Sequence, residues 1–279
     1  MSEQINPAIH PAISPAVNPA GIDAYAPAEM AHRIETAGVS KAALATLPLL
    51  ALAVLAGAFI AFGGMFYLVA ITDSGLGFGP TRLLGGLAFS LGLVLVVVGG
   101  AELFTGNNLI VMGWAHGTVP LAGLLRNWFF SYAGNFAGAV AMAFLASLSG
   151  FLMLGGGAVL DNAVAIAKAK TELPFVTALV RGILCNTLVC LAVWLCFSAR
   201  TAGSKILCIV FPISAFVALG FEHSIANMFF IPLAMFAGAE GVTVGGLVAN
   251  LVPVTVGNVI GGGVFVAFTY YVIYLRGRP

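Results

Sequence analysis

The stretch Gly-Phe-Glu-His-Ser-Ile-Ala-Asn-Met at residues 220–228 places polar side chains in the middle of a long apolar run, 205–238. The stretch Gly-Gly-Ala-Glu-Leu-Phe-Thr-Gly-Asn-Asn at residues 99–108 interrupts another long run, 84–116, in the same way. Both runs exceed 30 residues, whereas one helical crossing of a bilayer needs about 20. Each interruption carries a Glu and, later, an Asn. The pattern predicts two membrane helices that are broken near their middles.

The composition of the whole chain is that of an integral membrane protein. Of its 279 residues, 61% are hydrophobic and 8% are charged, and the mean hydropathy is +1.07. Because helices satisfy their own backbone groups inside lipid, these runs predict an all-α polytopic fold. The net charge of +1, without a basic run, excludes nucleic acid as a partner. The predicted spans are 43–72, 84–116, 124–155, 175–198, 205–238 and 246–275.

Ionisable residues are rare inside these spans, and only Glu102, Glu222 and His223 lie far within them. An ionisable group in hydrocarbon costs roughly 2.5 kcal/mol or more, so it persists mainly where it faces a bundle interior or a substrate route. These residues therefore mark the predicted pathway. The cysteines lack a metal-type pairing with histidine, so they predict buried thiols, and we expect no metal and no cofactor. They are Cys185, Cys190, Cys196 and Cys208.

A second pair of matching signatures indicates an internal repeat. Ala-Gly-Asn-Phe-Ala-Gly at 133–138 matches Val-Gly-Asn-Val-Ile-Gly at 256–261, and each follows one of the interruptions. Two three-helix halves explain this order, and an odd number of crossings in each half inverts the second half relative to the first. The substrate site is then expected near the bilayer midplane. The N-termini of half-helices offer free N–H groups there, which suits a small anion.

The regions outside the spans give the predicted domain organisation and orientation. Residues 1–42 form a tail, proline-rich at first and then compatible with a short surface helix from Ala28 to Lys41, with an apolar stripe from Met30 to Val39. Residues 43–276 form the pore domain, and 277–279 a short C-terminus. Seven Lys and Arg residues fall on the side of both termini and four on the other. The positive-inside rule therefore predicts cytoplasmic termini, and the tail is a candidate to close the pore at low pH.

Four motifs in series resemble the formate/nitrite transporter family, over about residues 30–276. They are Ala-Glu-Leu-Phe-Thr at 101–105, Asn-Thr-Leu-Val-Cys-Leu-Ala-Val-Trp at 186–194, Gly-Phe-Glu-His-Ser-Ile-Ala-Asn-Met at 220–228, and Pro-Val-Thr-Val-Gly-Asn-Val-Ile-Gly-Gly-Gly at 253–263. The resemblance implies an aquaporin-like protomer of six helices, with the second and fifth broken. It also implies a homopentamer in which every protomer has its own pore, in the inner membrane of a bacterium.

The resemblance also implies roles for individual residues. Thr105 and His223 would face each other at the centre of the pore, and Asn186 would line it. The implied apolar constrictions are Phe89 and Leu93 toward the cytoplasm, and Phe216 with Phe221 toward the outside. The implied vestibule residues are Lys170 on the outer side and Lys41 on the inner side.

Physical chemistry assigns further roles to the polar residues. A proton from His223, whose imidazole titrates near neutral pH, would turn formate into formic acid, which crosses apolar constrictions more easily than the anion. The Thr105 hydroxyl can donate to the anion or bond back to its own helix. Glu102 and Glu222 are expected to be structural, accepting hydrogen bonds from N–H groups freed at the breaks. Asn135, Asn258 and Asn227 are expected to support the packing of the repeat.

The substrate is expected to be formate, moved by a channel-like or a proton-coupled route. Gly106, Asn107 and Asn108 after Thr105 depart from the formate branch, whereas the end of the chain, 252–276, is closer to it. Nitrite, hydrosulfide and short monocarboxylates such as acetate or lactate remain alternatives. A neutral-solute channel similar to aquaporins is a weaker interpretation, because Asn107 and Asn227 are not part of Asn-Pro-Ala motifs. The sequence carries no nucleophile, base and acid set, so we do not expect an enzyme.

Overall fold

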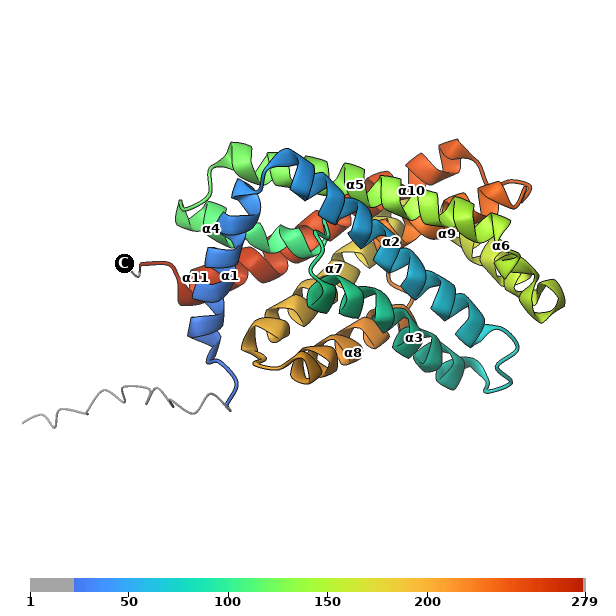
Figure 1. Cartoon of the computed structure of the whole chain (residues 1–279), viewed down its shortest axis with the longest axis horizontal. Helices are drawn as coiled ribbons and strands as arrows, with labels where there is room; N and C mark the ends of the chain where they lie inside the picture. The colour runs from blue at the N-terminus through green and yellow to red at the C-terminus, as the bar shows by residue number, and fades with distance from the viewer. Residues whose placement is uncertain (1–22, 278–279) are drawn as a thin grey trace, which may run out of the picture.

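The computed structural model describes residues 23–277, so the predictions for the proline-rich tail 1–22 and for 278–279 lie outside the described residues. The described chain is helical throughout, with all elements in one bundle (Figure 1). The elements are α1 (Pro27–Ala43), α2 (Thr46–Ile71), α3 (Phe78–Gly99), η1 (Gly106–Ile110), α4 (Val111–His116), α5 (Leu121–Leu148), η2 (Phe151–Gly157), α6 (Ala158–Thr171), α7 (Phe175–Ser198), α8 (Ala202–Ala218), α9 (Ser224–Phe236), α10 (Val244–Val259), η3 (Ile260–Phe268) and α11 (Thr269–Tyr274).

The chain leaves helical geometry at both sequence interruptions. Helix α3 ends at Gly99, and the next helical element, η1, begins at Gly106. Helix α8 ends at Ala218, and α9 begins at Ser224. Gly100 and Gly220 follow α3 and α8 with φ of 82° and 74°, a left-handed conformation that costs glycine little. Each long apolar run is therefore two helices that meet inside the bundle.

Six helical stretches of the described chain have the length and composition of membrane spans: Thr46–Ile71, Phe78–Gly99, Leu121–Leu148, Phe151–Thr171, Phe175–Ser198 and Val244–Tyr274. This set differs from the predicted one at two places. The run 205–238 consists of the shorter helices α8 and α9, and helix α6 occupies a region where the sequence predicted no span. One face of α6 packs against the bundle through residues spaced four apart: Val159, Ala163 and Ala167. A short amphipathic helix can pack in this way without crossing a membrane.

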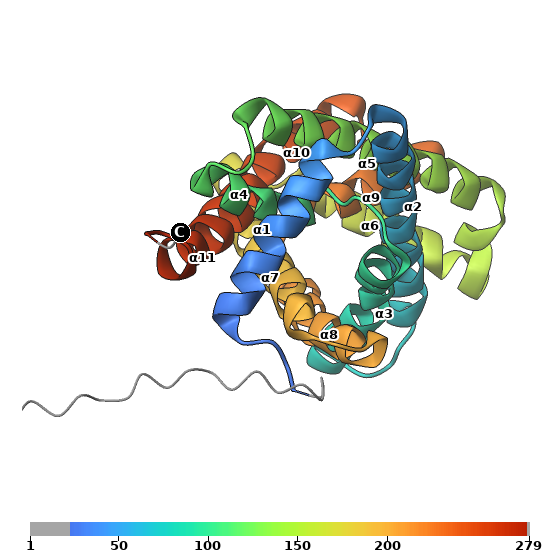
Figure 2. The ribbon, with the colours of Figure 1, turned by 60° about the vertical axis from the view of Figure 1, so that its left-hand side comes forward.

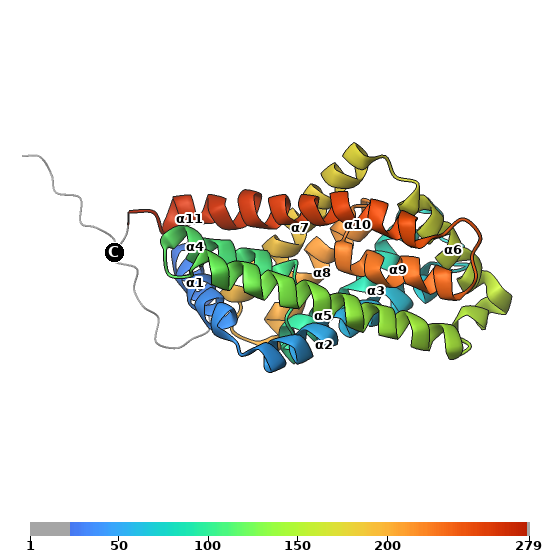
Figure 3. The ribbon, with the colours of Figure 1, turned by 90° about the horizontal axis from the view of Figure 1, so that it is seen from above.

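Both ends of the described chain lie at the same end of the bundle, and α6 lies at the other (Figure 3). Helix α1 runs across the end that carries α4 and α11 (Figure 2). Its buried residues include Met30 and Ile34, as predicted, but the stripe continues through Gly38 and not through Val39, which is 39% exposed. Gly38 lies against Ile110 of η1, because residues four apart return to the same face of a helix. The helix thus packs on the first break.

Glycines bring the helices of each half into close contact, and they do so in the same way in both halves. A Cβ on Gly138 of α5 would lie 2.0 Å from the carbonyl oxygen of Val54 in α2. A Cβ on Gly261 would lie 2.1 Å from the carbonyl oxygen of Ile183 in α7. Small residues at such crossings allow backbones to approach closely, which is how membrane helices associate. Helix α2 therefore packs tightly on α5, and helix α7 packs tightly on α10 and η3. These two helix pairs support the two breaks.

We expect Gly138→Val to destabilise the fold, because its side chain has no space against the α2 backbone. Overpacking of this kind costs about 1–3 kcal/mol. Thermal unfolding of the purified protein in detergent measures the loss as a lower Tm. Gly79→Ala is the control, since nothing lies within 4 Å of the added Cβ. An unchanged Tm in Gly138→Val would contradict the close helix contact.

Candidate functional site

Thr105 and His223, one from each break, meet in the interior of the bundle. The Thr105 Oγ1 atom lies 2.9 Å from His223 Nε2, and both residues are buried. The His223 Nδ1 atom accepts a hydrogen bond of 3.2 Å from the backbone N–H of Ala226 and so caps α9. A backbone N–H can only donate, so a neutral imidazole in this position carries its proton on Nε2. Nε2 then donates to Thr105 Oγ1, and the Thr105 hydroxyl proton remains to be offered to another acceptor.

The carboxylate of Glu102 is held by two side chains, one from α1 and one from η1. Its Oε1 accepts from Lys41 Nζ at 2.5 Å, and its Oε2 accepts from Asn107 Nδ2 at 2.8 Å. The Asn107 amide also donates to Asn127 Oδ1, and the Asn127 amide donates to the carbonyl of Lys41. The group forms a closed ring of hydrogen bonds that ties α1 and α5 to the first break. A buried carboxylate is stable only when it is paired and hydrogen-bonded in this manner.

The carboxylate of Glu222 is held by the same set of residue types in the second half. Lys170 Nζ donates to its two oxygens at 3.0 and 3.1 Å, and Asn227 Nδ2 donates to Oε2 at 2.7 Å. The Asn227 amide also donates to Asn250 Oδ1, and the Asn250 amide donates to the carbonyl of Lys170. Both halves of the repeat therefore build the same Lys–Glu–Asn–Asn ring.

Asn135 and Asn258 satisfy the backbone at the breaks. The Oδ1 atom of Asn135 accepts from the N–H of Phe104, and that of Asn258 accepts from the N–H of Ser224, both at 2.9 Å. Each amide nitrogen donates to two carbonyls, one on a neighbouring helix and one that belongs to the Glu of its own half. The expectation that the glutamate side chains accept the freed N–H groups is thus wrong. Amides do this instead, because they offer both a donor and an acceptor.

Asn186 lies behind the first break and joins it to the second half. Its Nδ2 is within hydrogen-bond distance of the carbonyls of Thr105 and Asn258, at 3.2 and 2.7 Å, and of Asn108 Oδ1, at 2.8 Å. The side chain is fully buried and lines neither of the cavities described below. Its pore-lining role stays a prediction, since Thr105, whose carbonyl it contacts, is likewise buried outside both cavities. The residue holds the loop that carries Thr105 against α7.

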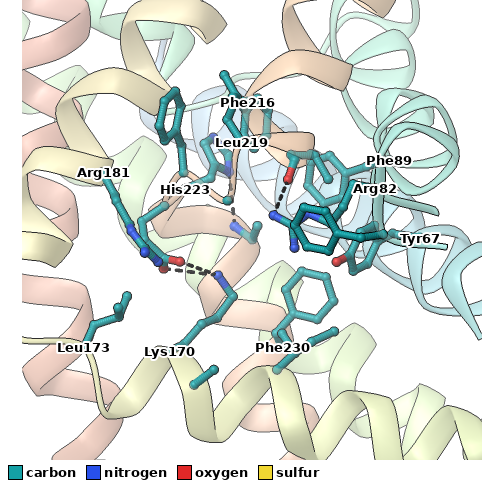
Figure 4. A pocket seen from close by; sticks show the side chains of 18 residues that line it. Tyr67, Arg82, Phe89, Lys170, Leu173, Arg181, Phe216, Leu219, His223 and Phe230 are labelled. Carbon is teal, nitrogen blue, oxygen red and sulfur yellow. Dashed lines mark hydrogen bonds and ion pairs between the residues drawn. The ribbon is translucent and has the colours of Figure 1, made fainter. Parts of the chain in front are cut away.

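A cavity of about 340 Å³, the α6-side cavity, opens toward α6 and reaches His223 (Figure 4). Aromatic rings form much of its wall, and the rings of Phe89 and Phe216 meet edge to face with centroids 5.7 Å apart. Phe216 also lies beside the imidazole of His223, with ring centroids 5.9 Å apart. Three cationic residues, Arg82, Lys170 and Arg181, line the same cavity, together with Phe221, Glu222 and Phe230.

A cavity of about 310 Å³, the α1-side cavity, opens at the opposite end of the bundle. It is lined by Leu93 and Leu103 together with Lys41, Glu102 and Asn107, and also by Val96, Val193, Phe197 and Lys205. The two cavities approach the Thr105–His223 contact from opposite ends, and the contact itself is buried between them.

The constriction residues divide differently from the prediction. Leu93 lines the α1-side cavity, as expected, but Phe89 lines the α6-side cavity with Phe216 and Phe221. Four helical residues rise about 6 Å, enough to place Phe89 and Leu93 on opposite sides of a narrow barrier. Leu103, from the first break, is the apolar partner of Leu93 in its cavity. Sequence reasoning missed it because an isolated leucine in an apolar chain carries no signal.

Sequence reasoning also missed two residues of the hydrogen-bonded rings. Asn127 and Asn250 are buried, and each stands eight positions before the capping asparagine of its half. That shared spacing was the signal that could have revealed them. Arg181 and Lys205 also line the cavities. The sequence used them only to predict the orientation in the membrane, because no motif surrounds them that would indicate a site.

Comparison with known proteins establishes the family. The formate/nitrite transporter family model matches residues 28–272. The chain belongs to the formate/nitrite transporter family. The formate channel FocA of Escherichia coli (strain K12) is 44% identical over 273 residues, covering 91% of this chain and 96% of that protein.

Solved structures of the family carry the same fold. A pentameric formate channel with formate bound is 40% identical, with a TM-score of 0.77 over 83% of this chain and 98% of that one. An ion channel of the formate/nitrite transporter family is 30% identical, with a TM-score of 0.82 over 88% and 98%. This chain is thus a multi-pass membrane protein built on the transporter family fold, as the sequence motifs predicted.

We expect Asn258→Ala to lower the stability of the folded protein. The change strips the Ser224 N–H and the carbonyls of Gly182 and Glu222 of their partner, and an unsatisfied buried polar group costs about 1–3 kcal/mol. The Tm in detergent reports the loss. Asn162→Ala is the matched control, since Asn162 makes a single side-chain bond, to Thr72 on the partly exposed α6 side. Equal Tm values for the two variants would contradict the capping role.

We expect Lys170→Met to destabilise the protein more than the double variant Lys170→Met with Glu222→Leu. Removing one partner of a buried ion pair leaves the other charge uncompensated, at a cost of about 3–5 kcal/mol, whereas replacing both by apolar groups often costs little. Unfolding temperatures of the two variants and the wild type test this order. A double variant less stable than Lys170→Met would show that the pair itself stabilises the fold.

Proposed function

We propose that this protein transports formate across the inner membrane of a bacterium. The single observation that supports this most directly is the Thr105–His223 contact, which presents two neutral hydrogen-bond donors between two cavities. In this contact only the threonine hydroxyl proton is free. When a carboxylate of formate size displaces the bond from His223 Nε2–H to Thr105 Oγ1, its two oxygens accept from both donors, the imidazole Nε2–H and the threonine hydroxyl. The relatives support the same substrate, because one is a formate channel and another is a structure with formate bound.

The central donors favour an anion without holding it permanently. A fixed positive charge at the centre would bind formate tightly and slow its release, whereas neutral donors replace hydration at a smaller cost. The neutral side-chain pair is flanked by apolar groups, Phe89 and Phe216 on one side and Leu93 and Leu103 on the other. Hydrated ions are excluded by these groups, and the passing formate exchanges water for the donors.

Proton-coupled movement uses the same imidazole. A second proton on His223 must go to Nδ1, which then stops accepting from the Ala226 N–H, since imidazolium has no acceptor. The Nε2 proton of that imidazolium passes to formate, and formic acid leaves through the apolar constriction. The ring is then neutral with its proton on Nδ1, and it returns to the starting tautomer when Nε2 takes up a proton and Nδ1 releases one. Protonation of the ring and capping of α9 are therefore mutually exclusive, which ties proton uptake to a local change at the second break.

The remaining parts of the proposal concern assembly, orientation and side-chain roles. A homopentamer with a pore in each protomer is supported by the pentameric relative. Cytoplasmic termini are supported by the excess of Lys and Arg at the end of the bundle that carries α1 and α11. No covalent chemistry is assigned to any residue, so the proposed function is transport and not catalysis. Nitrite, a monovalent anion of similar size, is the competing substrate.

The functional test is transport into proteoliposomes at about pH 5.5 and about pH 7.5, with the wild type beside His223→Ala and His223→Asn. We expect formate uptake that is faster at the lower pH and carries protons, because a higher proton concentration favours the transfer of a proton with each formate. Both variants should lose the proton coupling. Nitrite uptake in parallel decides between the two anions.

The proposal has two ways to fail in this experiment. Wild-type vesicles that move neither formate nor protons would refute formate transport. Variants that keep wild-type coupling would refute the role of His223 while leaving formate transport intact. Thr105→Ser, which retains the hydroxyl, and Thr105→Val, which removes it at similar size, separate donation by Thr105 from its packing.

A further inference from the structure

The cations that line the two cavities differ in whether their charge is already compensated. Lys41 donates to Glu102 at 2.5 Å, and Lys170 donates to both oxygens of Glu222. Each pair sums to no net charge, and each lysine is also tied into the hydrogen-bonded ring that holds its break. A lysine bound in this way offers little attraction to an approaching anion.

Arg82 is also occupied, by backbone groups. Its Nε donates to the carbonyl of Ala218 and its Nη2 to that of Val217, both at 2.9 Å. These carbonyls are the last of α8, where the helix supplies no further N–H groups, although that of Val217 also accepts from the N–H of Gly220 at 3.1 Å. The guanidinium therefore serves as the C-terminal cap of α8 at the second break, and its hydrogen-bonding capacity toward a ligand is reduced.

Two cavity-lining cations have no such partner. Within residues 23–277, the side chains of Arg181 and Lys205 make no hydrogen bond, ion pair or cation–π contact. Arg181 belongs to α7 and lines the α6-side cavity with His223, and Lys205 belongs to α8 and lines the α1-side cavity with Leu93 and Leu103. Arg181 is exposed and Lys205 is half-buried, so both remain hydrated and accessible. Each of these two cavities thus contains one cation whose head group has neither an ion-pair nor a hydrogen-bond partner among the described residues.

We infer that Arg181 and Lys205 are the residues that receive the transported anion at the two ends of the pore, in place of the neutralised Lys170 and Lys41. This inference rests on the proposed function, transport of a small monovalent anion. The anion exchanges part of its hydration for the free guanidinium or ammonium and then moves to the donors of Thr105 and His223. Arg181 suits a planar carboxylate in particular, because a guanidinium can donate two parallel hydrogen bonds to it.

Lys205 also connects the α1-side cavity to a third cavity, of about 530 Å³, that lies beside α1. This third cavity is lined by polar and charged residues of α1, among them Glu29, His32, Arg33, Thr36 and Ser40. Cys196, Phe197 and Lys205 belong to the walls of both cavities. An anion can therefore reach Lys205 from the side of α1, so α1 need not leave its place across the end of the bundle for the anion to enter.

The test is the initial rate of formate uptake into proteoliposomes at formate concentrations below saturation, at low and at high ionic strength. At Arg181 the series is Arg181→Lys, Arg181→Gln and Arg181→Glu, and at Lys205 it is Lys205→Arg, Lys205→Gln and Lys205→Glu. A unit charge within about 4 Å changes the local concentration of an anion roughly fivefold in water. We expect each Gln variant to lose roughly that factor, each Glu variant to lose more, and each conservative variant, which keeps the charge, to lose less than its Gln variant.

Ionic strength separates attraction from structure. The differences within each series should shrink as salt rises, because the Debye length falls from about 30 Å at 0.01 M to about 8 Å at physiological ionic strength. Lys168→Gln and Arg276→Gln are matched controls, since both remove an exposed cation that lines none of the three cavities. They should transport at the wild-type rate. Elution volume and Tm confirm that all variants are folded.

Each outcome decides a separate claim. Rates in Arg181→Gln and Lys205→Gln that equal the wild type, or losses that are the same at every ionic strength, would overturn the inference while formate transport stands. A wild type that moves formate no faster than empty vesicles would overturn the proposed function, and the inference with it. Losses that are equal in Lys168→Gln and Arg181→Gln would assign the attraction to the overall charge of that face and overturn the role of Arg181.

Discussion

The structure depends on the neutralisation of two carboxylates inside an apolar bundle. Glu102 and Glu222 are each about 95% buried, and an uncompensated charge at such a place would cost several kcal/mol. Each is held by one lysine and one asparagine, from different elements. The lysines come from α1 and α6, and the asparagines come from the helical elements that follow the breaks. The need to pair these charges fixes where α1 and α6 pack and where the two breaks lie.

The repeat is symmetric in this scaffold and asymmetric at the centre. The Lys–Glu–Asn–Asn ring and the capping asparagine occur in both halves. One position after its Glu, the first half has Leu103 and the second half has His223. Three positions after its Glu, the first half has Thr105 and the second half has Ile225. Each half therefore contributes one polar donor and one apolar residue, and the two halves have them at opposite positions relative to the Glu. A duplicated support thus carries two different donors, which meet at 2.9 Å.

Much of this arrangement could be predicted from the sequence, and the limits have physical causes. Polar motifs inside long apolar runs predict the breaks, and the matching asparagine motifs predict the repeat, because polar residues in lipid are costly and therefore informative. The partners of the glutamates could not be predicted, since Lys41 and Lys170 lie 61 and 52 positions away in sequence. The side of the barrier that Phe89 faces depends on a rise of a few ångströms along its helix, which the sequence does not specify.

We propose that a neutral imidazole faces the anion at the centre of the pore, with Nδ1 accepting from the Ala226 N–H and Nε2 carrying the proton that it donates. The most direct test is the ¹⁵N NMR spectrum of ring-labelled protein in lipid at about pH 7.5, with His10, His32 and His116 replaced so that His223 alone reports. We expect an unprotonated Nδ1 and a protonated Nε2, and a change in the Nε2 signal when formate is added. A proton on Nδ1, with Nε2 unprotonated, would contradict this proposal.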